Sequence, residues 1–422
     1  MKRLAKNKGY VTLMSAQAIS SIGDWLSIVA IITLVGLKWN ASPMEVSFII
    51  LCLAVPMALL GPVAGIVADR FSRKTIMIIS DVVRAGLILF LTVATEIWMV
   101  YVTLFTVGLF SAVFIPAKNG KLKEVVSEDD MKGAMSITSM IDSSTKILGP
   151  LISGVLVAAF GAQKVFFIDS ATFVISAFLL FFLPNAVKVE AVEKETSGEK
   201  ESFKREFVEG LSHIKSSRFM VIGLLLTGIS LLILQLADSQ IIVLLRELTN
   251  ASPDLFGYLV TGSGLGMFFA GLLLAKKTDY RAYPVMLFGV CGIGLSFGLM
   301  GVLTHYDIGY SIIWGPALGF TGGFSASLIF VPFQATAQVE TSVNMTGRVF
   351  GVINSVMTTA TIIGPLLGGW LATVIGIIPT FTITSGLLVL VSIIGVFTKK
   401  KVNRGNKHGT TGERRTSAAT TG

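Results

Sequence analysis

Long runs of apolar residues, separated by short polar segments, repeat along the whole chain. A helix that crosses a bilayer needs about 20 mostly apolar residues. Six runs of this length lie in the first half, at 10–37, 45–68, 75–95, 97–116, 135–160 and 164–185. Six more lie in the second half, at 219–245, 255–275, 282–304, 308–332, 348–374 and 377–398. The pattern predicts an all-α membrane protein with twelve transmembrane helices.

The first and the last of these helices depend on how an apolar run is interpreted. The run Val11–Leu37 has about 27 residues, whereas the core of a cleaved signal peptide has about 7–15, so we expect a retained span. The stretch from Val349 to Thr398 contains no charged residue and is too long for one crossing at ~1.5 Å per residue. Gly376 and Pro379 interrupt it, and we therefore divide it into two helices.

Composition supports the same class of protein. Hydrophobic residues make up 53% of the chain and charged residues 14%, and the mean hydropathy is +0.77. A soluble domain has about 25% charged residues, so the surplus apolar residues must face lipid. The sequence contains no G-x-x-x-x-G-K-[ST] loop, no G-x-S-x-G element and no cluster with zinc spacing. We therefore expect no enzymatic activity, no cofactor and no metal.

Basic residues are distributed unevenly between the two sides that the spans define. With the N-terminus inside, all but five of the 34 lysines and arginines fall in cytoplasmic segments. The exceptions are Lys38, Lys164 and Arg246 outside, and Arg84 and Lys146 within spans. This asymmetry predicts a multi-pass protein of the cell membrane with both termini in the cytoplasm. The net charge of +9 then reflects orientation, and we expect no nucleic-acid partner.

The spans divide the chain into four segments. These are a six-helix bundle at 1–185, a cytoplasmic linker at 186–218, a second six-helix bundle at 219–398 and a polar tail at 399–422. The linker is rich in charges of both signs, and a short amphipathic helix is expected near Phe203–Ile214. The tail is rich in Gly and Thr and is expected to be disordered. We expect the chain to work as a monomer in the lipid bilayer.

The two bundles resemble each other in sequence. Asn40-Ala-Ser-Pro43 after the first span recurs as Asn250-Ala-Ser-Pro253 after the seventh, and Gly149-Pro150 in the fifth recurs as Gly364-Pro365 in the eleventh. A nearly constant offset of this kind predicts a parallel repeat of two six-helix units. In that architecture a substrate binds between the halves, near the middle of the membrane.

The segment after the second span reads Gly65-Ile-Val-Ala-Asp69-Arg70-Phe-Ser-Arg73-Lys74. It resembles the G-x-x-x-D-R-x-x-R-K signature of the major facilitator superfamily of transporters. Within that superfamily the chain looks like the macrolide-efflux and enterobactin-exporter group. The residues that carry this second resemblance are Asp81, Arg84, Phe114, Pro116, Ala117, Gly347, Arg348, Val349 and Phe350.

The resemblance implies roles for two sets of residues. A cytoplasmic gate would be formed by Gly65, Asp69, Arg70, Arg73, Lys74, Asp81, Arg84 and Arg348. A helix bend with tight packing would be formed by Gly149, Pro150, Gly154, Gly364, Pro365 and Gly369. Proline removes a backbone donor and small residues let helices approach closely, which suits two bundles that rock against each other. Ordinary bundle packing explains the same residues equally well.

Ionisable side chains inside spans are costly and often mark transport pathways. Asp24 lies near the middle of the first span, and Gln17 shares its helix face. We expect Asp24 to carry protons or to recognise a cation; the alternative is a structural carboxylate hydrogen-bonded to Ser20 or to another helix. Asp238 and Gln235 are their counterparts in the seventh span, and they can also form only an outer gate.

Asp142 and Lys146 lie four residues apart, a spacing that favours an ion pair.

Three functions remain open from the sequence. The first is proton-coupled efflux of small amphipathic or cationic compounds by alternating access. The second is import of a nutrient or metabolite on the same fold, and the third is a membrane sensor that binds without transporting.

Overall fold

The structure, a computed structural model, describes residues 2–184, 199–249, 252, 254–276, 280–341 and 345–417. Within this part of the chain every regular element is helical. The first half contains α1 (Lys2–Lys6), α2 (Lys8–Thr33), the π-helix η1 (Leu34–Lys38), α3 (Pro43–Arg70), α4 (Arg73–Phe90), α5 (Ile97–Val125), α6 (Glu128–Phe160) and α7 (Ala162–Phe181). The second half contains α8 (Glu199–Ser216), α9 (Arg218–Asp238), α10 (Ile241–Arg246), α11 (Leu255–Lys276), α12 (Ala282–His305), α13 (Ser311–Glu340), α14 (Thr346–Ile375) and α15 (Ile377–Ser417).

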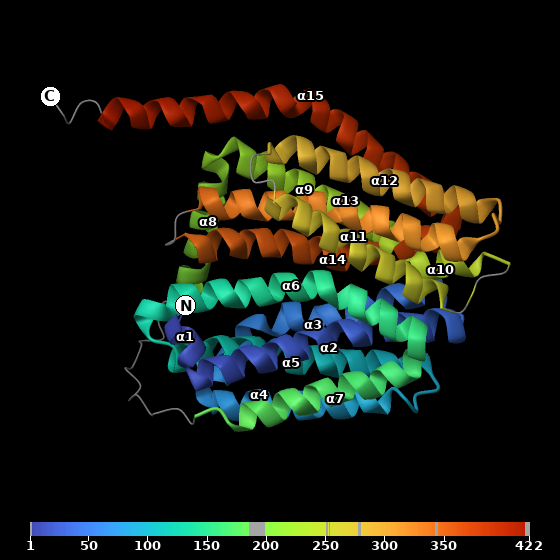
Figure 1. Cartoon of the computed structure of the whole chain (residues 1–422), viewed down its shortest axis with the longest axis horizontal. Helices are drawn as coiled ribbons and strands as arrows, with labels where there is room; N and C mark the ends of the chain where they lie inside the picture. Colours follow the sequence, from blue (N-terminus) through green and yellow to red (C-terminus); the bar gives the residue numbers. More distant parts are fainter. Residues whose placement is uncertain are drawn as a thin grey trace.

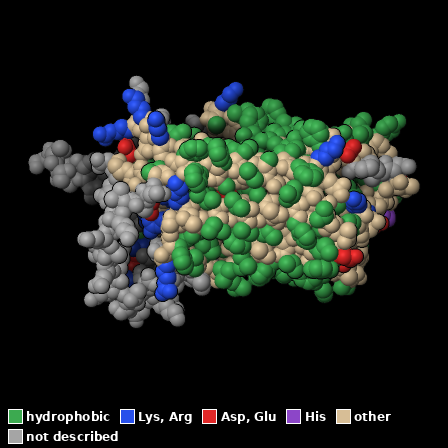
Figure 2. All heavy atoms as spheres, turned by 90° about the horizontal axis from the view of Figure 1, so that it is seen from below, with side chains coloured by type: hydrophobic (Ala, Val, Ile, Leu, Met, Phe, Trp, Pro, Cys, Tyr) green, Lys and Arg blue, Asp and Glu red, His purple; other side chains and the backbone are tan. Residues whose placement is uncertain are grey.

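Eleven helices in the described residues are long and apolar enough to cross a membrane. They correspond to eleven of the twelve predicted spans. The remaining prediction, 75–95, is α4, whose 18 residues include the ionisable side chains of Arg73, Lys74, Asp81 and Arg84. Figure 2 shows the consequence for the surface: apolar side chains form a broad belt across the middle, and charged side chains gather at the two ends.

The two halves lie side by side, with their long helices running in the same general direction (Figure 1). In the first half, α3 packs against α5, and α7 packs against α2 and α4. In the second half, α13 packs against α11 and α12, and α9 packs against α14 and α15. The halves meet mainly where α6 packs against α11 and where α3 packs against α14.

Glycine ends the corresponding helix in each half. Gly161 separates α6 from α7 with a φ of 77°, and Gly376 separates α14 from α15 with a φ of 91°. A positive φ is accessible to glycine at little cost because it lacks a Cβ atom. The predicted break at Gly376 is therefore confirmed, and its counterpart stands at the equivalent place in the first half.

Two segments outside the spans differ from the sequence predictions in extent. The helix α8 begins at Glu199 and ends at Ser216, so it is longer than the helix expected at 203–214; residues 185–198 lie outside the described part. α15 continues beyond the predicted span to Ser417, into the segment expected to be disordered. Extending an existing helix requires no new nucleation, which favours this continuation.

The halves touch at the end of the bundle opposite the N-terminus, which is called the far end below. It comprises η1, the start of α3, the α6–α7 junction, α10 and the start of α11. The Ser47 hydroxyl donates a hydrogen bond of 2.6 Å to the carbonyl oxygen of Pro365, and the Gln240 amide donates one of 2.8 Å to Ser47. Arg246 donates one of 3.1 Å to the carbonyl oxygen of Gly36. These bonds hold the far end closed.

Candidate functional site

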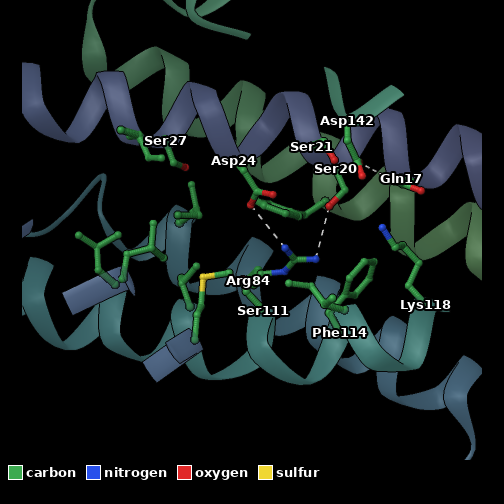
Figure 3. A pocket seen from close by; sticks show the side chains of 18 residues that line it. Gln17, Ser20, Ser21, Asp24, Ser27, Arg84, Ser111, Phe114, Lys118 and Asp142 are labelled. Carbon is green, nitrogen blue, oxygen red and sulfur yellow. Dashed lines mark hydrogen bonds and ion pairs between the residues drawn. The ribbon is translucent and has the colours of Figure 1, made fainter. Parts of the chain in front are cut away.

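A cavity of about 370 Å³ opens among the helices of the first half (Figure 3). Its lining comes from α2 to α7 and includes Gln17, Ser20, Ser21, Asp24, Ser27, Arg84, Ser111, Phe114, Lys118 and Asp142. All of its lining residues belong to the first half. The sequence places a site between the two halves, whereas this charged cavity lies within one of them.

Arg84 from α4 is the centre of the polar network. Only 2% of its side chain is exposed, and its guanidinium forms ion pairs with Asp81 and, at 3.4 Å, with Asp24 on α2. It also donates a hydrogen bond of 3.4 Å to Ser20. The sequence assigned Asp81 and Arg84 to the cytoplasmic gate. In the structure α4 continues past the gate segment and brings Arg84 beside Asp24, at the cavity.

Two aromatic rings contact the Arg84 guanidinium. Its central carbon lies 4.7 Å from the ring centre of Phe114 on α5 and 4.5 Å from that of Phe173 on α7. A guanidinium within about 6 Å of a ring centre is attracted by the negative face of the ring. These contacts fix the orientation of a cation that has little access to water.

Two carboxyl groups, Asp24 and Asp81, pair with this single guanidinium, and a third, Asp169, lies near Asp24. Asp81 is fully buried and accepts a hydrogen bond of 2.6 Å from Ser176. Asp169 on α7 is also fully buried, accepts from Ser27 and Thr172, and lies close enough to Asp24 for the two carboxylates to interact. Asp24 differs from both, because 47% of its side chain is exposed, toward the cavity. If all three were ionised, the cluster would carry two uncompensated negative charges.

The opposite end of the cavity contains a second polar group. Gln17 donates a hydrogen bond of 2.6 Å to Asp142 on α6, and the Lys118 side chain from α5 turns toward this pair (Figure 3). The predicted ion pair between Asp142 and Lys146 is not found among the described contacts; Asp142 bonds to Gln17 instead, and Lys146 is exposed.

Sequence reasoning missed Lys118. It ended the fourth span at residue 116 and counted Lys118 among the cytoplasmic residues that follow. In the structure α5 continues through Pro116 to Val125, because neighbouring helices stabilise a proline-containing span. The helical spacing of Ser111, Phe114 and Lys118 then places all three on the cavity side of α5. The spacing of these three residues was the feature of the sequence from which Lys118 could have been assigned to the site.

The signature segment braces helices of the first half at the N-terminal end. Arg73 forms an ion pair of 2.7 Å with Glu124 on α5, and Lys74 donates a hydrogen bond of 2.7 Å to the carbonyl oxygen of Leu183. Arg70 is exposed, a Cβ added at Gly65 would meet no atom within 4 Å, and the side chain of Asp69 lies outside the described residues. Arg348 forms an ion pair with Glu209 on α8.

The two glycine–proline elements lie at contacts between the halves. A Cβ atom at Gly154 would lie 2.6 Å from the carbonyl oxygen of Gly257 on α11. A Cβ atom at Gly369 would lie 2.9 Å from the carbonyl oxygen of Pro43 on α3. Small residues allow this close approach of backbones.

The other members of these elements pack within their own half, apart from Pro365, whose carbonyl oxygen bonds to Ser47 of the first half. Gly149 faces the ring of Trp25, and Gly364 faces the side chain of Gln235. Pro150 is buried within α6. Asp238, at the end of α9, is exposed, and neither it nor Gln235 lines the cavity around Asp24. The internal repeat relates Asp238 to Asp24 in sequence, but the two carboxyl groups do not line one common cavity.

This architecture has close counterparts among known proteins. Residues 13–243 and 236–420 each match the model of the Major Facilitator Superfamily. The chain belongs to this superfamily. As a major facilitator protein it is an integral, multi-pass membrane transporter, and the family resemblance of its signature segment is confirmed.

Relatives within the superfamily cover nearly the whole chain. An uncharacterised MFS-type transporter of Bacillus subtilis (strain 168), YfiS, is 38% identical over 402 residues, which cover 94% of this chain and 95% of that protein. Macrolide efflux protein A of Streptococcus pyogenes is 23% identical over 391 residues, which cover 91% and 94%. The crystal structure of the nucleoside transporter NupG has a TM-score of 0.70 at 11% identity and covers 93% of this chain and 99% of that chain, which shows the major facilitator fold.

Proposed function

We propose that this transporter is a proton-coupled exporter of small amphipathic or cationic compounds, located in the cell membrane with both termini in the cytoplasm. The observation that carries the proposal is the pairing of Asp24 and Asp81 with Arg84, with Asp169 near Asp24 and with Asp24 open to the cavity. The carboxyl groups outnumber the guanidinium, so protonation of one carboxylate reduces the excess negative charge. The cluster can therefore take up and release a proton. Asp24 is the member that water and substrate can reach.

The size and lining of the cavity support a small amphipathic substrate. Ligand sites of about 300–1,000 Å³ are typically apolar with a few polar groups, and this one has about 370 Å³. Leu53, Met57 and Ile88 supply apolar surface, while Asp24 supplies a carboxylate for a cationic group. The likeness to macrolide efflux protein A supports export as the direction.

Coupling follows from competition at Asp24. When Asp24 is ionised, it pairs with Arg84; when it is protonated or occupied by a substrate cation, Arg84 keeps Asp81 as its partner. A proton and a cationic substrate therefore exclude each other at one carboxylate, which is the requirement for antiport. In the proposed orientation the end that Ser47, Gln240 and Arg246 hold together faces outward.

Flux measurements in liposomes test this proposal. Ethidium, a small aromatic cation, is the probe, and pH gradients of each sign are imposed on wild-type protein, on Asp24→Asn and on the control Asp307→Asn, whose carboxylate lies in a loop. We expect gradient-driven ethidium flux in the wild type and the control and its loss in Asp24→Asn. Unchanged gradient-driven flux in Asp24→Asn would reject Asp24 as the coupling group, and flux that uses the opposite gradient would support an importer.

A further inference from the structure

A second hollow, of about 380 Å³, lies at the far end and is separate from the cavity around Asp24. We call it the far-end groove. Its apolar wall comes from η1 and the last turn of α6, and its polar rim comes from the first turn of α7 and the start of α11. The lining residues are Thr33, Leu34, Leu37, Lys38, Val157, Phe160, Gly161, Ala162, Gln163, Lys164 and Asp254.

The charges in this groove are unusual for this end of the molecule. The span pattern leaves three basic residues on the far side of the membrane, and two of them, Lys38 and Lys164, line the groove. The third, Arg246, bonds to the carbonyl oxygen of Gly36. Among the described contacts neither Lys38 nor Lys164 has an ion-pair or hydrogen-bond partner for its ammonium group, and both side chains are exposed. With Asp254, the groove carries a net charge of +1.

Apolar residues line the groove beside its two lysines. Phe160 is half exposed beside Lys164, and Leu37 precedes Lys38 in the same wall. An occupant must therefore offer an anionic group to two lysines and an apolar body to the wall beneath them. A phosphate group on an acyl-bearing glycerol has both features, whereas inorganic phosphate has only the first.

We propose that the far-end groove binds the headgroup of one anionic glycerophospholipid from the surrounding bilayer. The phosphate lies between Lys38 and Lys164, headgroup hydroxyls face Asp254, and an acyl chain follows Leu37 and Phe160. The groove joins the first half to Asp254 at the start of α11 in the second half, so the bound lipid stabilises the closed far end. This inference does not depend on the identity of the transported compound.

Lipid titration in phosphatidylcholine nanodiscs or detergent tests the proposal, with phosphatidylglycerol as the probe and native mass spectrometry and thermal unfolding as readouts. The variant is Lys38→Gln/Lys164→Gln, and the matched control is Lys215→Gln/Lys276→Gln, which removes the same charge from exposed positions at the opposite end. We expect saturable binding that the groove variant weakens about 30-fold, from about a fivefold factor for each lysine near lipid phosphate. The control should stay within about twofold of wild type.

Three results would overturn the proposal. Equal loss of affinity in the groove variant and the control would mean that the lipid responds only to net charge. Unchanged affinity in the groove variant would place the lipid elsewhere. Displacement of phosphatidylglycerol by millimolar inorganic phosphate would mean that the groove takes a soluble anion. Because both lysines are exposed, the variants are expected to fold, which circular dichroism and gel filtration check.

Discussion

Replacing Ser47 with alanine tests whether the hydrogen bonds at the far end keep the two halves closed there. Ser47 is fully buried, donates to the carbonyl oxygen of Pro365 at 2.6 Å and accepts from Gln240 at 2.8 Å. Gln240 keeps a second acceptor, the carbonyl oxygen of Pro43 at 3.1 Å. The substitution therefore leaves one buried carbonyl oxygen without its side-chain donor and weakens one amide contact.

The expected shift between closed and open molecules follows from the hydrogen bonds that Ser47→Ala removes. A buried polar group left without its partner costs about 1–3 kcal/mol. When the far end opens, water reaches these groups, so the cost falls on the closed state alone. At about 1.4 kcal/mol for each factor of ten, the ratio of open to closed molecules should rise about 5-fold to 150-fold.

Double electron–electron resonance measures this ratio directly. Spin labels at Gln163 and Tyr310 lie on exposed positions of opposite halves at the far end, and the two native cysteines are first replaced by alanine. The matched control is Ser392→Ala, because Ser392 donates a similar buried bond of 2.9 Å to the carbonyl oxygen of Leu287 within one half. The control should lower stability without changing the distance distribution. A wild-type distribution in Ser47→Ala would refute the reasoning.

Three further changes test other parts of the structure. Arg84→Gln should lower the free energy of unfolding by about 3–5 kcal/mol, because buried carboxylates lose their cation; thermal unfolding measures this, and adding Asp81→Asn should restore part of the loss. Gly154→Val should cost about 1–3 kcal/mol by forcing α6 from α11 and should populate the open far end in the same resonance assay. Gly86→Val is the control, because an added Cβ there meets no atom within 4 Å. It should not populate the open far end. Asp307 interacts with the side chain of Thr249 and accepts a hydrogen bond of 3.1 Å from its backbone N–H, and these interactions lower the pKa of Asp307 below the ordinary 3.8. The ionised carboxylate of Asp307 therefore contributes its full stabilisation above about pH 4, and this stabilisation is lost as the pH falls further. The melting temperatures of the wild type and of Asp307→Asn should differ by a constant amount from about pH 5 to 7, and this difference should become smaller below about pH 4.

Local chemistry explains which features could be predicted. A span must satisfy its backbone inside the helix and present apolar side chains to lipid, so a run of about 20 apolar residues determines its own structure. Glycine at a positive φ determines a break in the same local way, as Gly376 does. The repeat of motifs gave the two-bundle architecture because matching residues occur in order along the chain.

The site required information that no single segment contains. Arg84 lies beside Asp24 because α4 and α2 both pack against α7, although 60 residues separate them in sequence. Lys118 entered the site only because α5 continues through Pro116, which its neighbours permit. Arg348, which the sequence assigned to the gate, pairs with Glu209 on α8.

The sequence by itself determined the membrane class, the helical repeat and the position of Asp24 near the middle of a span, because each depends on residues close together in one segment. The tertiary structure decided which charges share a cavity and which end of the bundle is closed. Those properties depend on how helices pack and on distances between side chains from different helices, and the periodicity of a single helix does not contain them.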